Sequence, residues 1–132
     1  MAIAGHGANI ASNHFLDDRD WDLQRDYYER SRCPHVSYHI NIDAEDEMTS
    51  PEEMLTNAKN NVAFMRSLFE KDILLENVPT KAGNKARELL ATPKFMCQVI
   101  EETNTYFLLD IAHAKVAADV LAIPYRDYIE AL

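Results

Sequence analysis

The sequence predicts an α/β fold in which strands and helices alternate as about four β-α units. Short apolar runs recur along the chain, and each is followed by a segment with helical spacing of its apolar residues. Such alternation favours parallel strands, because right-handed crossovers make neighbouring strands point the same way. With 132 residues the chain has the size of one domain, whereas a complete eight-stranded β/α barrel takes about 250 residues.

Four strands are predicted where a short apolar run meets a polar residue and a turn. Gly5 and Gly7 stand at the end of the first apolar run, and they predict an early end to the strand with a flexible segment over residues 5–9. The run that begins at His35 alternates weakly between apolar and polar residues. The predicted strands cover residues 2–6, 35–40, 72–77 and 105–110.

Helix boundaries are marked by prolines and capping residues. Pro34 cannot extend the helix before it, and Ser50-Pro51-Glu52-Glu53 forms a capping box with proline at the first helical position. Thr92-Pro93 opens another helix in the same way. The predicted helices cover residues 21–32, a segment that starts at 51, and residues 84–91, 93–103, 112–121 and 124–132.

Charge and cysteine content exclude several functions. The net charge of −9 argues against a nucleic-acid or anionic-membrane surface, since both need clustered lysine and arginine. The most acidic stretch, residues 43–53, is expected to be a solvated loop that leads into a helix. Two cysteines make no disulfide framework, and the chain starts without a signal-peptide pattern or a long apolar stretch. We therefore expect a reduced, cytoplasmic protein.

Four candidate metal ligands recur at a nearly constant interval, each at the end of a short apolar run. They are His6, His39, Glu76 and Asp110, and the interval is the length of one β-α unit. If the strands run parallel, these side chains converge on the rim where α/β folds place their chemistry. His113, three residues after Asp110, can face the same cavity from a helix.

Each ligand also has a plain structural interpretation. His6 can be a loop histidine, His39 a neutral core histidine, and Asp110 the cap of the next helix. Glu76 follows three apolar residues and needs a partner, a metal ion or solvent. Asn77 offers an amide that could orient a carboxylate or meet a substrate. Imidazole and carboxylate donors without thiolate suit iron(II), manganese or zinc, whereas calcium and magnesium prefer oxygen ligands alone.

Five motifs along the chain resemble those of the DUF692 proteins, the multinuclear non-haem iron-dependent oxidases. The run FLLDIAHAKVAA resembles that family's aspartate-containing segment, and LLENVP resembles its glutamate-ended strand. The resemblance covers nearly the whole chain, in order. The motifs lie at residues 5–9, 36–40, 74–79, 107–118 and 124–132.

The resemblance implies a TIM-barrel-like fold that binds two or three irons at its rim. It also implies dioxygen-dependent modification of cysteine, or another residue, in a ribosomally made precursor peptide that a small partner protein delivers. His6, His39, Glu76 and Asp110 would be iron ligands or their close neighbours. Asn77 and His113 would line the site.

Four strands cannot close an eight-stranded barrel. We therefore expect residues 1–132 to form a single, partial TIM-barrel-like domain. The chain would be a fragment, a small open α/β domain, or one that pairs with another chain, including a homo-oligomer that completes the barrel.

Two other classes of function stay open. The related sugar-isomerase and endonuclease barrels also place histidine, glutamate and aspartate at strand ends, and would use manganese or zinc. An inactive remnant or interaction module would bind metal weakly or not at all.

Overall fold

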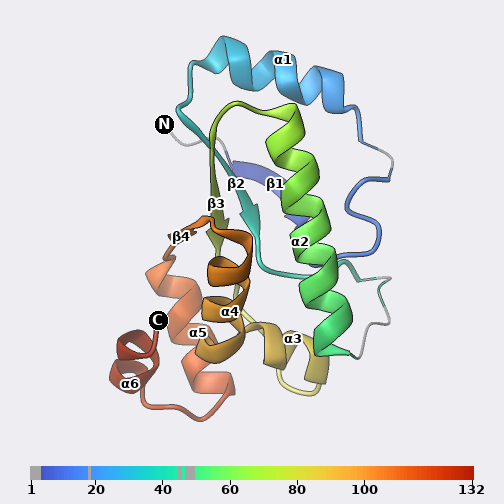
Figure 1. The fold of residues 1–132 in the computed structure, drawn as a ribbon. Coiled ribbons are helices and arrows are strands. Elements are labelled where there is room, and N and C mark those ends of the chain that lie inside the picture. The colour runs from blue at the N-terminus through green and yellow to red at the C-terminus, as the bar shows by residue number, and fades with distance from the viewer. Residues whose placement is uncertain (1–3, 18, 45, 47–49) are drawn as a thin grey trace.

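The structure, a computed structural model, describes residues 4–17, 19–44, 46 and 50–132, with side chains from residue 8 onward (Figure 1). Strands and helices alternate along the chain, as predicted. The strands are β1 (Ala4–Asn9), β2 (His35–His39), β3 (Asp72–Glu76) and β4 (Tyr106–Leu108). The helices are α1 (Trp21–Ser31), α2 (Pro51–Leu68), α3 (Lys85–Leu90), α4 (Pro93–Thr103), α5 (Ile111–Val120) and α6 (Tyr125–Glu130).

The described residues form a four-stranded sheet in the order β1-β2-β3-β4, and each neighbouring pair is parallel. Strands that follow one another in the chain are therefore neighbours in the sheet, as in a partial TIM-barrel-like unit. β2 and β3 pair without a shift, from His35 opposite Asp72 to His39 opposite Glu76. Glu76 in turn pairs with Leu108 of β4, so the carboxyl ends of these three strands are level.

One face of the sheet packs against helices. Val36 pairs with Ile73 and Tyr38 with Leu75, so the four side chains share this face, and all are buried. Their cluster includes Val62 of α2, the helix that runs alongside the strands in Figure 1. This face therefore supplies the main apolar core.

The opposite face is more polar and more open. Ser37 pairs with Leu74, and Leu74 with Tyr106, whose side chain is 63% exposed. His39 and Glu76 follow on the same face, two positions further along their strands. β2 ends in His39 and β3 ends in Glu76, and both of these polar residues lie on the face away from the helix-packed core.

Local capping chemistry sets the helix starts as predicted. The Ser50 side chain accepts from the Glu53 amide at 3.3 Å at the start of α2, and Thr92 accepts from the Phe95 amide at 3.3 Å at the start of α4. The latter helix ends at Asn104, whose positive φ of 50° is a conformation that asparagine tolerates well.

β1 reaches further than predicted. It runs through the glycines to Asn9, and the next two amides continue the pairing: Ile10 N donates to His39 O at 2.9 Å and Ala11 N to Asn41 O at 3.1 Å. The register shifts between Ala4 and Asn9, so the glycine-containing stretch is an irregular part of the strand rather than a flexible exit. As a result Asn9 is level with His39.

β4 is shorter than predicted, because Asp110 belongs to the start of α5 instead of the strand. In the part of the chain that the structure describes, no helix combines the length and apolar character needed to cross a membrane.

Candidate metal centre

The parallel register brings His39 and Glu76 together at the carboxyl ends of β2 and β3. His39 Nε2 lies 3.8 Å from Glu76 Oε2, and the Glu76 side chain is only 12% exposed. A largely buried carboxylate needs a compensating partner, and an imidazole supplies one. The two residues lie close together because the strands are parallel and in register, and their role as metal ligands stays a prediction.

Asp110 and His113 come from the first turn of α5. Asp110 caps the helix: its Oδ1 accepts from the His113 amide at 2.9 Å. The other carboxylate oxygen, Oδ2, lies 3.7 Å from His113 Nδ1. One carboxylate therefore both fixes the start of the helix and faces the imidazole one turn later.

The ligand atoms of Glu76, Asp110 and His113 all lie within 4.8 Å of one another. Glu76 has a different imidazole near each oxygen, since Oε1 lies 3.4 Å from His113 Nδ1 while Oε2 faces His39. His113, predicted only to line the site, is thus as close to the carboxylates as the predicted ligands are. The signal for it in the sequence was its spacing of three residues from Asp110.

His6 lies within β1, whereas the sequence placed it at the strand end. Its side chain is outside the part that the structure describes, so its role as a ligand stays a prediction. Asn9 is the β1 residue that is level with His39.

Asn77 lies behind the ligands. Its side chain is 1% exposed and exchanges two hydrogen bonds with the backbone of Asp110, at 2.7 and 2.9 Å. The backbone oxygen of Asn77 lies 2.9 Å from His113 Nδ1. The side-chain amide of Asn77 therefore makes its hydrogen bonds within the protein and is not presented to a substrate.

A cleft of about 890 Å³ opens beside the candidate ligands, with His39 and His113 among its lining residues. One wall is the segment after β2 and the other is the segment after β3, residues 78–84. Arg87 Nη2 donates to Ile42 O at 3.1 Å and ties the two walls together. The wall after β2 contributes Asp43 and Asp46, the opposite wall contributes Lys81, and Arg87 of α3 also lines the cleft.

The acidic stretch that the sequence placed in solvent is partly folded inward. The Asp46 side chain is fully buried and accepts hydrogen bonds from the hydroxyl of Ser12 and the amide of Asn13. Asp43 accepts from Asn9 Nδ2 at 2.6 Å, and its other oxygen lies 2.7 Å from the Ser12 hydroxyl, whose single proton the two carboxylates share. These contacts join the exits of β1 and β2, and they depend on pairings across the chain that spacing does not reveal.

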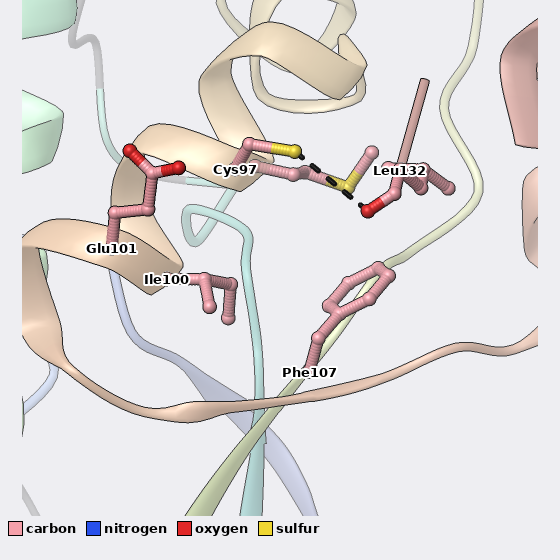
Figure 2. A pocket seen from close by; sticks show the side chains of 6 residues that line it. Cys97, Ile100, Glu101, Phe107 and Leu132 are labelled. Atoms are coloured by element: carbon pink, nitrogen blue, oxygen red, sulfur yellow. Dashed lines mark hydrogen bonds between the residues drawn. The ribbon is translucent and has the colours of Figure 1, made fainter. Parts of the chain in front are cut away.

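A second, smaller pocket of about 160 Å³ lies between α4, β4 and the end of the chain (Figure 2). Figure 2 shows the Cys97 thiol near the carbonyl of Leu132, at 3.9 Å, with Phe107 on another side. The pocket is lined mainly by apolar side chains and by none of the candidate ligands described above. Of histidine, cysteine, aspartate and glutamate, its lining includes only Cys97 and Glu101, fewer than the three residues of the cluster described above.

Comparison with known proteins agrees with the motifs. Over residues 1–132 the chain matches the model of a family described as "RiPP precursor modification enzyme MbnB/TglH/ChrH", where RiPP denotes a ribosomally synthesised and post-translationally modified peptide. A search of curated proteins found no match. The family match confirms the resemblance seen in the sequence motifs, and the chain belongs to this family of RiPP precursor modification enzymes.

Proposed function

We propose that this chain is a metal-dependent oxidase that uses dioxygen to modify cysteine, or another residue, of a ribosomally made precursor peptide. The observation that carries the proposal is the convergence of Glu76, Asp110 and His113 within 4.8 Å, beside a cleft large enough for a substrate side chain. The family description supports a precursor peptide as the substrate.

The donor set fits an iron centre. Two carboxylates and an imidazole, with His39 next to one of them, are ligands of the kind found in non-haem iron and two-metal sites. Neither cysteine lines the cleft beside these ligands, and Cys97 of α4 lines the smaller apolar pocket. Bound iron would supply the binding of dioxygen and of a substrate thiolate.

The protein's own residues would hold the metal ion and orient the peptide. Glu76 lies between two imidazoles, so each of its two oxygens can act as a ligand on the side of one imidazole. Asp110 is fixed by its capping bond, so the direction of its second oxygen is set by the start of α5. The cleft walls would admit an extended peptide past His39 and His113, with acidic groups on one wall and basic groups on the other. We include in the proposal a small partner protein that delivers the peptide.

The test loads the purified chain with iron(II), manganese(II) or zinc(II) under argon and measures retained metal by elemental analysis. The iron-loaded protein is then mixed with a synthetic cysteine-containing precursor peptide, with and without dioxygen, and the peptide mass is recorded. We expect retained iron and a mass change that requires dioxygen. Retention of manganese or zinc alone, with no dioxygen-dependent mass change, would favour the isomerase or endonuclease alternative. Protein that retains none of the three metals would be the inactive remnant.

A further inference from the structure

Asn77 joins two elements that carry candidate ligands. It directly follows Glu76, where the β3–β4 ladder ends with Glu76 opposite Leu108. Its side-chain amide then continues the pairing: Nδ2 donates to Asp110 O at 2.9 Å, and Oδ1 accepts from Asp110 N at 2.7 Å. The amide thus acts as an additional peptide group, which fixes the start of α5 against the end of β3.

The backbone of the same residue acts on His113. Asn77 O lies 2.9 Å from His113 Nδ1, and a carbonyl oxygen can only accept a hydrogen bond. In this contact Nδ1 donates its single proton to Asn77 O, while oxygens of Glu76 and Asp110 lie 3.4 and 3.7 Å away as nearby charges. In a neutral ring Nε2 then keeps the lone pair that a metal ion requires.

We propose that Asn77 is a positioning residue of the metal centre: its side chain fixes Asp110, and its carbonyl holds His113 with the Nε2 lone pair available. The proposal rests on the proposed function, because it assigns Asn77 a role in arranging metal ligands. Burial to 1% exposure places the amide out of reach of substrate, so its effect would pass through the two neighbours.

Few other side chains could replace this amide. Leucine has a similar size but neither donates nor accepts, and aspartate lacks the donor that Asp110 O receives. Asn61 provides a matched control, since it is also buried and its amide donates to Ile10 O at 2.9 Å and Ser12 O at 3.1 Å. Asn61 holds the exit of β1 and contacts none of the three clustered ligands through these bonds.

The experiment compares the full chain with Asn77→Leu, Asn77→Ser and Asn61→Leu. The tautomer of each histidine is read in the metal-free protein by long-range ¹H–¹⁵N NMR, and Co²⁺ affinity is read by titration with its visible spectrum. We expect the Nδ1–H tautomer for His113 in the unaltered chain, and also in the Asn77 variants because they keep the backbone carbonyl. Co²⁺ affinity should be about 10–100-fold weaker in the Asn77 variants, because they lose the bonds that fix Asp110. Asn61→Leu should lower thermal stability but keep the tautomer and the affinity.

Unaltered Co²⁺ affinity in both Asn77 variants would overturn the proposal, as would an Nε2–H ring for His113 in the unaltered chain. Asn77→Ser is smaller and still polar, so it serves where Asn77→Leu does not fold. If the unaltered chain takes up no Co²⁺, the proposed function fails. The NMR measurement on metal-free protein still decides whether the Asn77 carbonyl sets the tautomer of the His113 ring.

Discussion

Leu75 and Glu76 are neighbours on β3 but belong to opposite faces of the sheet. Leu75 is fully buried in the cluster beneath the helices, whereas Glu76 lies between two imidazoles beside the cleft. The same alternation separates Tyr38 from His39 on β2. Alternate residues of the same strands therefore carry the apolar core and the candidate metal ligands, so substitutions on the two faces should have separable effects.

The largest expected effect is on metal binding. Glu76→Gln removes the charge of the candidate ligand that both imidazoles face, and we expect Co²⁺ affinity to fall by at least about 100-fold with little change in thermal stability. Titration calorimetry measures the affinity. Glu102→Gln is the control, because Glu102 is a surface residue paired with Lys59 at 3.0 Å. Equal affinities in the two variants would contradict the account.

The helix-packed face should respond in the opposite way. Leu75→Ala is expected to lower the free energy of unfolding by about 2–5 kcal/mol, because it leaves a cavity in a close-packed cluster. Leu74→Ala, on the half-exposed opposite face, should cost clearly less. Denaturant unfolding of the metal-free protein measures both. Equal losses would mean that the two faces are equally packed.

Asp110 belongs to both regions, and its two roles can be separated. Asp110→Ser keeps a good helix cap, so we expect the free energy of unfolding to change by about 0.5 kcal/mol or less, while Co²⁺ affinity falls strongly. Asp110→Ala should lose both the affinity and about 1 kcal/mol. A serine variant that still binds Co²⁺ tightly would exclude the carboxylate as a ligand.

The smallest expected effect lies in the loop after β1. A hydrogen bond to Asp17 at 3.0 Å raises the pKa of His14 above 6.5, helped by the nearby charges of Asp46 and Asp43. The folded state therefore holds this proton more tightly than the unfolded chain. Its contribution to stability is complete below the unfolded pKa and is lost as pH rises through the folded value. NMR titration should show the raised pKa, and Asp17→Asn should reduce it. A His14 pKa that Asp17→Asn leaves unchanged would contradict this assignment.

Local chemistry made the helices predictable. The starts of α2 and α4 follow from Ser50-Pro51 and Thr92-Pro93, whose capping bonds involve residues only a few positions apart. β1 was less predictable because its length depends on β2: the chain continues to pair beyond the glycines, which favoured an early end by themselves.

The same distinction holds for the site. The meeting of His39 and Glu76 follows from parallel strands, and was predicted. The closeness of His113 to the two carboxylates depends on the geometry of the Asp110 cap, and the burial of Asp46 depends on Ser12 from another loop. Such contacts between distant segments leave no periodic signal in the sequence.

The most direct test of the central claim is X-ray absorption at the iron edge of anaerobic, iron(II)-loaded protein, for the unaltered chain and for Glu76→Gln. The account predicts a coordination shell of nitrogen and oxygen only, with imidazole among the ligands, that is lost or strongly depleted in Glu76→Gln. A sulfur neighbour, or an iron signal unchanged by the substitution, would place the metal elsewhere and contradict the account.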